Sequence, residues 1–421
     1  MPSSQKFFPQ IELCADPIFV IGSDRSGTTV LVRSLSQHSV LWSSAETDYL
    51  FHLFGEGRAS KAYRWAIKRP SGNWLKKENV SKPEFLEALG IGINCLFTSR
   101  SRGKRWMDHT PGYTMMVDML ADMFPGAYFL HMLRDGRRVV HSMINIMNTF
   151  KPDARQRMID EGYVPGYVDF GTACRRWSLF VEKALDFELS HPDRVKTIRN
   201  EEITEDPERS FREIFDFIKV PYEKGPDEFF RHNRINSSFA KSSTDPSVRE
   251  KLDPWQDWNI EQKRTFLELA GPTLVRSGFA KEGDLALSDY EQLVLRIKEV
   301  TSANLPENAR FAVVNNGDLQ LLKVGSRQGR PLPQNQEGDY SGGDPADSEE
   351  AQASVQLAKT QGADYILFPS TAYWWFEHYP GFKQYLDSRY SRLEIPSEDC
   401  IIFDLGNSSP HTRVDVRVTN G

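Results

Sequence analysis

The stretch PIFVIGSDRSGTTVLVRSL, residues 17–35, decides the fold. Its apolar run at residues 18–21 has the length of a buried strand. A glycine-containing turn follows at residues 22–27, and an apolar pattern at helical spacing begins after Thr29. A strand, a glycine loop and a helix start in this order are typical of a phosphate-binding loop, because the first N–H groups of a helix lack partners within the helix and attract anions. The stretch therefore predicts an anion-binding loop where a strand leads into a helix.

The glycines of this loop have the spacing of the Walker A pattern, G-x4-G-K-[ST], but the lysine of that pattern is missing. Gly22 and Gly27 match the two glycines, Thr28 stands at the lysine position, and Thr29 fills the hydroxyl position. Arg25 supplies a positive charge within the loop. A metal-bridged nucleoside triphosphate is therefore a less suitable ligand. On these residues alone, a plain strand–turn–helix and a kinase-like nucleotide enzyme both remain open.

The length and composition fit a soluble globular protein of at least two domains. The chain has 421 residues, of which 39% are hydrophobic and 26% are charged. No run approaches ~18 consecutive apolar residues, so we expect no membrane span. Residues 1–14 lack the pattern of a signal peptide. The four cysteines lie far apart, which predicts reduced thiols and a cytoplasmic location.

The net charge of −6 is unevenly distributed along the chain. From Ser288 onward there are 12 Lys and Arg against 19 Asp and Glu, a balance of −7. The preceding residues carry the other 40 basic and 39 acidic side chains, a balance of +1. An acidic tail argues against a polyanionic partner, so nucleic-acid binding is not expected. No cluster of His, Cys, Asp and Glu has metal-ligand spacing, so we expect no metal.

Strand and helix patterns alternate along the first two thirds of the chain, which predicts a parallel α/β sheet. Further strands are expected at residues 127–133 and 194–199, and helices at 115–123, 139–147, 174–189 and 208–218. Residues 151–170 are rich in Gly and Pro and are expected to form a loop. A loop of this length often forms part of the wall of a substrate site.

A polar segment at residues 281–289 predicts a boundary between two domains, at 1–287 and 288–421. The second, smaller domain is also expected to be α/β. An Asn-Asn-Gly-Asp turn at residues 315–318 predicts a hairpin between the strands that flank it. The aromatic run at residues 373–375 is interpreted either as core or as a face that binds a sugar or the first domain. The role of this accessory domain stays open.

The complete string around Arg25 resembles the first cofactor motif of the sulfotransferase family, in which a basic residue precedes Ser-Gly-Thr-Thr. Members of this family transfer a sulfuryl group from 3′-phosphoadenylyl sulfate (PAPS), and the resemblance implies a P-loop-NTPase-like parallel sheet flanked by helices. It also implies that the 5′-phosphosulfate end of PAPS is held by Arg25, Ser26, Gly27, Thr28 and Thr29. Arg25 would offset negative charge on the bridging oxygen as the S–O bond breaks.

A second motif of the family is an Arg at a strand end with a Ser eight residues later, and together they hold the 3′-phosphate. Arg134 and Ser142 stand in this arrangement within LRDGRRVVHS. The segment at residues 198–202 also resembles the family, and the resemblance covers residues 19–279. Two motifs in the right order, each at a strand-to-helix junction, are much harder to obtain by chance than either alone.

Two residues compete for the proton of the acceptor hydroxyl. Among sulfotransferases the chain looks most like the tyrosylprotein and bacterial branches, which carry a catalytic Glu where Glu46 stands. His109 stands where relatives of this branch carry a Lys, two residues before a Pro. The resemblance implies Glu46 as base and His109 as electrophilic partner, with Arg25 as a third catalytic residue. A neutral His109 could instead serve as the base, and the sequence does not decide between them.

A looser match at residues 234–241 makes Ser237, Ser238 and Lys241 further candidate contacts to the cofactor. The sequence therefore predicts a cytoplasmic, metal-free sulfotransferase that moves a sulfuryl group from PAPS to a hydroxyl of a small metabolite or glycan and releases 3′,5′-ADP. A kinase-like P-loop enzyme and a non-catalytic nucleotide-binding scaffold are the alternatives. The identity of the acceptor and the oligomeric state are not predicted.

Overall fold

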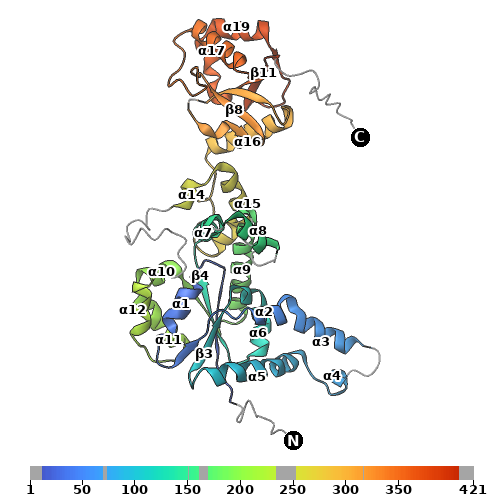
Figure 1. The fold of residues 1–421 in the computed structure, drawn as a ribbon, viewed down its shortest axis with the longest axis vertical. Coiled ribbons are helices and arrows are strands. Elements are labelled where there is room, and N and C mark those ends of the chain that lie inside the picture. Colours follow the sequence, from blue (N-terminus) through green and yellow to red (C-terminus); the bar gives the residue numbers. More distant parts are fainter. Residues whose placement is uncertain are drawn as a thin grey trace. The chain divides into compact units, whose positions relative to one another are not determined.

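The computed structural model describes residues 12–69, 74–149, 151–160, 169–233, 253–315 and 317–406 (Figure 1). The chain forms two compact units. The first comprises Met1–Trp258 and Thr265–Leu285, and the second comprises Asn259–Arg264 and Ala286–Gly421. The start of helix α15 (Ile260–Arg276) therefore belongs to the second unit.

The first unit is built on a five-stranded sheet in which all neighbouring strands run parallel, with the order β2-β3-β1-β4-β5. The strands are β1 (Ile18–Gly22), β2 (Leu41–Ser43), β3 (Arg105–His109), β4 (Tyr128–Leu133) and β5 (Val195–Arg199). Strand β1 lies in the middle and is buried along its whole length, which accounts for its uniformly apolar sequence. The predicted parallel α/β fold is confirmed.

Helices cover both faces of this sheet. Alternate residues of β1 face opposite layers, because side chains alternate along a strand. Phe19 and Ile21 pack against α5 (Lys82–Arg100), α6 (Val117–Met123) and α9 (Phe170–Ser190). Ile18 and Val20 pack against α1 (Thr28–Leu35) and α11 (Pro207–Ile218).

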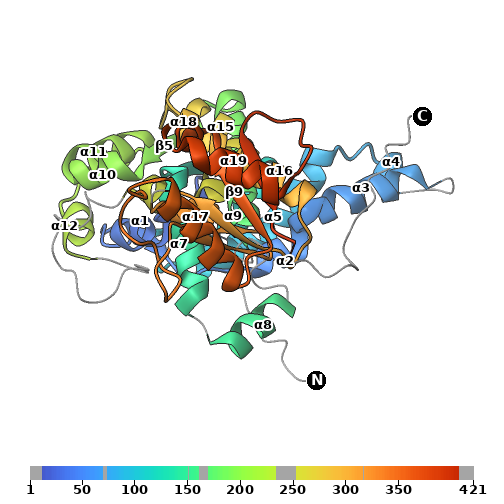
Figure 2. The same ribbon diagram turned by 90° about the horizontal axis from the view of Figure 1, so that it is seen from above.

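The remaining helices of the first unit surround these layers. Helices α10 (Asn200–Glu205) and α12 (Gly225–His232) gather with α11 beside α1 (Figures 1 and 2). The others are α2 (Tyr49–Phe54), η1 (Gly55–Gly57), α3 (Arg58–Lys68), α4 (Trp74–Lys77), η2 (Pro111–Met116), α7 (Gly136–Thr149), α8 (Pro152–Asp160) and α14 (Pro254–Asp257).

The second unit is a six-stranded mixed sheet with the order β10-β11-β9-β6-β8-β7. Its strands are β6 (Arg310–Val314), β7 (Lys323–Val324), β8 (Arg327–Leu332), β9 (Tyr365–Pro369), β10 (Ser391–Arg392) and β11 (Cys400–Asp404). Its helices are α16 (Asp289–Asn304), η3 (Leu319–Leu321), α17 (Ser348–Thr360), η4 (Ser370–Ala372), α18 (Trp374–His378) and α19 (Pro380–Arg389).

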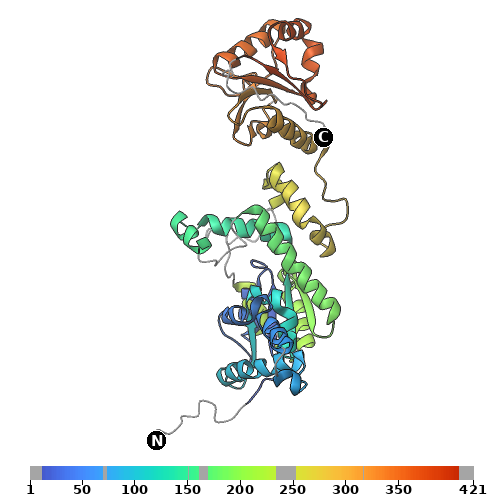
Figure 3. The ribbon, with the colours of Figure 1, turned by 90° about the vertical axis from the view of Figure 1, so that its right-hand side faces the viewer.

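The sheet of the second unit lies between α17 and α19 on one face and α16 on the other (Figure 3). Ala312 and Val314 of β6 pack toward α17 and α19, whereas Phe311 and Val313 pack toward α16. Trp375 is fully buried in the first of these clusters, so the core interpretation holds for this member of the aromatic run.

Two local predictions are wrong. Residues 152–160 form helix α8 rather than loop, because Pro152 occupies the first helical position, where its missing N–H costs nothing. The hairpin at residues 315–318 does not form. Strand β6 pairs in parallel with β8 and β9, and the hairpin of this region joins β7 to β8 instead.

None of the helices within the described ranges is both long enough and apolar enough to cross a membrane.

Candidate functional site

The loop between β1 and α1 has a strained backbone that passes very close to β4. Its residues Gly22, Arg25 and Gly27 have positive φ angles of 147°, 65° and 109°. A Cβ at Gly22 would lie 2.5 Å from the carbonyl oxygen of Met132, so this position requires glycine. Thr114, which lies in η2, holds the start of the loop through two hydrogen bonds. Its Oγ1 accepts from the Gly22 N–H at 2.9 Å and donates to the Gly22 carbonyl oxygen at 3.1 Å. The loop is thus held at the carboxyl ends of the central strands.

The loop and the helix start contain N–H and hydroxyl groups that can still form hydrogen bonds to a ligand. Helix α1 begins at Thr28, and its N-cap residue Gly27 supplies no side-chain bond to the free N–H groups. Ser26 is buried and its Oγ donates to the Ser23 carbonyl oxygen at 2.6 Å. The Ser23 hydroxyl is buried and has no hydrogen-bond partner among the described residues. This is the chemistry that an anion at a helix start requires.

Three of the predicted cofactor residues converge beside the loop. Arg25 Nε donates to Ser142 Oγ at 3.2 Å, and Arg134 Nη1 donates to the carbonyl oxygen of Arg25 at 3.0 Å. Arg25 comes from the loop after β1, Arg134 follows β4, and Ser142 lies on α7. Burial lowers the pKa of Arg134, and its Nε is buried without a hydrogen-bond partner in the described part of the chain. A desolvated cation with an unused donor is well suited to bind a phosphate.

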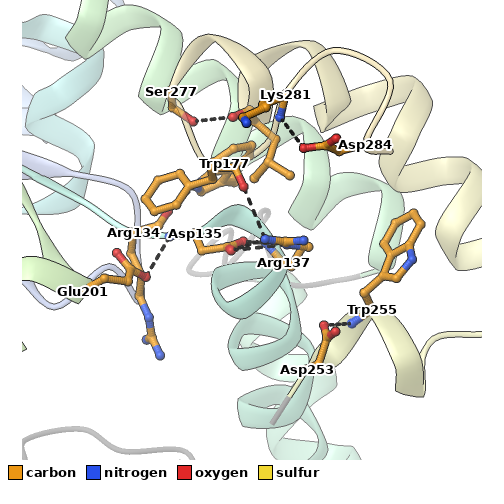
Figure 4. Close-up of polar contacts among 12 residues, drawn as sticks. Arg134, Asp135, Arg137, Trp177, Glu201, Asp253, Trp255, Ser277, Lys281 and Asp284 are labelled. Atoms are coloured by element: carbon orange, nitrogen blue, oxygen red, sulfur yellow. Dashed lines mark hydrogen bonds and ion pairs between the residues drawn. The ribbon is translucent and has the colours of Figure 1, made fainter. Parts of the chain in front are cut away.

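Side chains from three helices fix the backbone around Arg134 (Figure 4). Trp177 Nε1 on α9 donates to the Arg134 carbonyl oxygen at 3.3 Å. The Asp135 N–H donates to Glu201 Oε1 on α10 at 3.2 Å, and Arg137 Nη2 on α7 donates to Asp135 Oδ2 at 2.6 Å. Burial raises the pKa of Glu201. These contacts determine the direction in which the chain leaves β4, and hence where Arg134 stands.

Glu46 and His109 lie side by side. The distance from His109 Nε2 to Glu46 Oε1 is 3.9 Å. His109 is only 3% exposed, and neither ring nitrogen has a hydrogen-bond partner among the described residues. Burial lowers the pKa of His109 to about 4. Burial raises the pKa of Glu46, and a hydrogen bond with Thr29 opposes that shift. At neutral pH the imidazole is uncharged, and it lies beside a carboxyl group whose pKa is raised.

A buried carboxylate connects the segments that carry these two residues. Asp108, which is fully buried, accepts through Oδ2 from the Thr47 hydroxyl and from the Tyr113 hydroxyl, the latter at 3.1 Å. The Tyr113 hydroxyl also lies 2.7 Å from the Thr47 carbonyl oxygen. Burial raises the pKa of Asp108 to about 6. Because Thr47 follows Glu46 and Asp108 precedes His109, this network fixes the two residues relative to each other.

Comparison with known proteins decides the family. Residues 17–224 match the family model described as "Sulfotransferase family". This part of the chain belongs to the sulfotransferase family. The sulfotransferase segment is 22% identical over 273 residues to protein-tyrosine sulfotransferase A of Caenorhabditis elegans, covering 62% of this chain and 67% of that enzyme. It is 23% identical over 289 residues to an uncharacterised protein of Aquifex aeolicus, covering 66% of this chain but only 35% of the other.

Solved sulfotransferase structures also match this chain. The sulfotransferase domain from the curacin biosynthetic pathway is 19% identical, and the match covers 70% of this chain and all of that one, with a TM-score of 0.36. A mouse sulfotransferase complexed with PAP is 15% identical, and the match covers 70% and 91% of the two chains, with a TM-score of 0.35.

The predicted residues of the sulfotransferase site fall into two groups that share the β1–α1 loop. Arg25, Arg134 and Ser142 form the first group. Glu46 and His109 form the second, and the bond between Glu46 and Thr29 joins it to the loop. The further candidates Ser237, Ser238 and Lys241 lie outside the described residues.

Three supporting residues of the sulfotransferase site were not predicted. Arg176 Nε on α9 lies 2.5 Å from Asp24 Oδ2 of the loop. Asn200 Nδ2 donates to the Ser26 carbonyl oxygen at 3.0 Å. Asp108 is the third. A signal for Asp108 was available in the sequence, because it directly follows the apolar pair Trp106 and Met107 in β3, and a carboxylate buried in a strand needs specific partners. No local pattern marks Arg176, because 152 positions separate it from Asp24.

Proposed function

We propose that the chain transfers a sulfuryl group from PAPS to a hydroxyl of a small metabolite or glycan. The observation that carries this proposal is that Arg25, Arg134 and Ser142 converge at the β1–α1 loop, while Glu46 is hydrogen-bonded to Thr29 in the first turn of α1, directly after this loop. Bound PAPS supplies the sulfuryl group: its S–O bond breaks as the acceptor oxygen bonds to sulfur, and 3′,5′-ADP leaves.

The donor half of the site is formed by the loop and by Arg134. The loop hydroxyls and the first N–H groups of α1 bind the 5′-phosphosulfate, and Arg25 offsets the negative charge of the departing oxygen. Arg134 and Ser142 bind the 3′-phosphate. The residues fit this ligand, because the buried and unused Nε of Arg134 gains an acceptor when a phosphate is present.

In the acceptor half, Glu46 removes the proton of the hydroxyl. Its raised pKa makes it a stronger base than an ordinary carboxylate, and its hydrogen bond with Thr29 keeps it beside the donor loop. His109, whose pKa is lowered to about 4, stays uncharged at neutral pH. An uncharged imidazole still carries one N–H, which it donates to the sulfuryl oxygens as they gain charge. This differs from the Lys expected at this position, which would carry a full charge.

The reaction needs no metal in this proposal, since Arg25 and the first N–H groups of α1 supply the positive charge that the departing 5′-phosphate requires. A cytoplasmic location agrees with the cysteines: all four are free thiols, and Cys95, Cys174 and Cys400 are buried. Burial raises the pKa of Cys174 and of Cys400 to about 12, which keeps both unreactive.

The roles of Glu46 and His109 are tested by measuring turnover against pH for Glu46→Gln and His109→Gln. We expect Glu46→Gln to lower kcat by about 10²-fold or more and to leave the affinity for 3′,5′-ADP unchanged. In the wild type the rate falls as the pH drops through the raised pKa of Glu46, because the base becomes protonated. This acidic limb should disappear in Glu46→Gln and persist in His109→Gln. Near-normal turnover of Glu46→Gln would reject the assignment.

A further inference from the structure

The second unit has a pocket at the carboxyl ends of its central parallel strands. Strand β6 pairs in parallel with β8 along one edge and with β9 along the other. After β6 the chain continues to the side of the sheet where β8 lies. After β9 it continues to the other side of the sheet, where β11 lies. Open α/β sheets bind ligands in the crevice formed where two neighbouring connections diverge in this way. The pocket lies at this point, between the ends of β6 and β9.

The pocket has the size of a small molecule. Its volume is about 310 Å³, and it is lined by Tyr290, Val314, Asn315, Asp318, Leu321, Pro369, Thr371 and Ala372. One water occupies ~30 Å³ in the liquid, so the volume corresponds to about ten non-hydrogen atoms. A single sugar ring with its hydroxyl groups is of this size.

A buried acceptor in this pocket lacks a partner. Asn315 is 7% exposed and follows directly after β6. Its Nδ2 donates to the Asp318 carbonyl oxygen, and the Asp318 N–H donates to the Asn315 carbonyl oxygen at 2.8 Å. These two bonds fix the side chain, while Oδ1 stays buried without a hydrogen-bond partner among the described residues. A buried acceptor left unpaired is costly, so a ligand that donates a hydrogen bond at this point is favoured.

The charge of the pocket excludes anionic ligands. Asp318 is the charged side chain among the lining residues that the structure describes, and no Lys or Arg is among them. The Asp318 carboxylate accepts from the Gln320 N–H at 2.8 Å and from the Tyr290 hydroxyl. A phosphate or carboxylate would meet this negative charge without a cation to offset it. The net charge of −7 from Ser288 onward also disfavours the binding of anions.

We propose that this pocket binds a neutral hydroxylated molecule of the monosaccharide class, with a ligand hydroxyl donating to Asn315 Oδ1. The C–H faces of a sugar fit the apolar part of the lining, formed by Val314, Leu321 and Pro369, and Tyr290 supplies an aromatic ring. The site is separate from the sulfuryl-transfer residues, all of which belong to the first unit. It therefore gives the second unit a function of its own, in recognising a carbohydrate.

Saturation-transfer NMR on the full chain tests this proposal with glucose, galactose, mannose and N-acetylglucosamine as probes, each at millimolar concentration. We expect at least one sugar to bind. Asn315→Leu keeps the approximate shape of the side chain but removes the acceptor Oδ1, together with the Nδ2 bond to the Asp318 carbonyl oxygen, and it should weaken binding about tenfold or more. Thr371 is exposed and lines the pocket, so Thr371→Tyr should block entry without disturbing the core.

Thr360→Tyr is the matched control, because it makes the same change at an exposed position on α17 that does not line the pocket. Binding retained in Thr360→Tyr and lost in Thr371→Tyr supports the site. Absence of binding by all four sugars, binding that survives Thr371→Tyr, or tighter binding of glucose 6-phosphate than of glucose would overturn it. Affinity for 3′,5′-ADP, measured in the same samples, should not change, so failure of this site is distinguishable from failure of the sulfotransferase assignment.

Discussion

Thr47 connects the segment of the proposed base Glu46 to the buried carboxylate of Asp108. Its hydroxyl donates to Asp108 Oδ2, and its backbone carries the neighbouring Glu46. We expect Thr47→Val to lower kcat about tenfold, because one hydrogen bond to a charged group is lost and the segment bearing Glu46 is released. Thr47→Ser, which keeps the hydroxyl, should restore most of the rate. The 3′,5′-ADP affinity of both variants should equal that of the wild type, and a change in affinity without a change in kcat would contradict this positioning role.

Arg134 gives a prediction on the donor side. Arg134→Met removes the buried guanidinium proposed to bind the 3′-phosphate. Calorimetry should show adenosine 3′,5′-bisphosphate binding about tenfold to a hundredfold more weakly, with adenosine 5′-monophosphate changed little. Equal losses for both nucleotides would instead indicate that the change disturbs the loop through the lost bond to the Arg25 carbonyl oxygen.

The residues that the sequence identified and those it missed differ in a simple physical way. Arg25, Arg134 and Ser142 stand in short strings that resemble the two cofactor motifs of the sulfotransferase family. Arg176 and Tyr113 act through contacts with segments far along the chain, and the packing of the sheet and its helices creates those contacts. The uncharged state of His109 depends on burial, which the sequence around it does not reveal.

At the scale of elements, local patterns predicted β1 and β4 well because these strands are largely apolar and lie inside a parallel sheet. They also predicted the edge strand β5, in which the apolar residues Val195 and Ile198 are buried. The predicted hairpin failed because both edges of β6 are occupied by parallel neighbours. Its turn residues have another role. The side chain of Asp318 accepts from the Gln320 N–H and starts the short helix η3. A turn sequence therefore predicts a change of direction but not the partner of the strand before it.

The pairing of β4 with β5 carries a pH dependence. His131 on β4 is fully buried, and its Nδ1 lies 2.9 Å from Thr197 Oγ1 on β5. Burial lowers its pKa to about 3. Between pH 6.5 and pH 3 the unfolded chain binds a proton at His131 that the folded chain does not. The contribution of this residue to the free energy of unfolding is therefore complete above pH 6.5 and is lost as the pH falls toward 3.

His131→Gln should remove this dependence. Denaturant unfolding at pH 7 and pH 5 should show the wild type losing about 2 kcal/mol more than the variant, since one pKa unit corresponds to about 1.4 kcal/mol. His232→Gln, at an exposed position, is the control and should keep the behaviour of the wild type. An identical loss in His131→Gln and in the wild type would contradict the assignment.

At the scale of the whole molecule, composition indicated the general organisation. The first part of the chain has a balanced charge, and it contains the sulfotransferase segment with its clustered arginines. The rest of the chain is acidic, and its pocket is lined by Asp318 without a Lys or Arg among the described lining residues. The acceptor is not predictable in the same way, because it is recognised by side chains from separate segments that no short motif describes. The pocket of the second unit was missed because it depends on strand order, and the predicted hairpin gave a wrong order.

The most direct test of sulfuryl transfer is a screen with ³⁵S-labelled PAPS, using the full chain against pools of neutral glycans, small hydroxylated metabolites and tyrosine peptides, with EDTA present. We expect the label on one acceptor class, with one 3′,5′-ADP formed for each transfer and no transfer by Glu46→Gln. Transfer to tyrosine peptides alone would correct the acceptor class and leave the reaction in place. Label released only as inorganic sulfate, or turnover of Mg²⁺-ATP without use of PAPS, would contradict the proposed function.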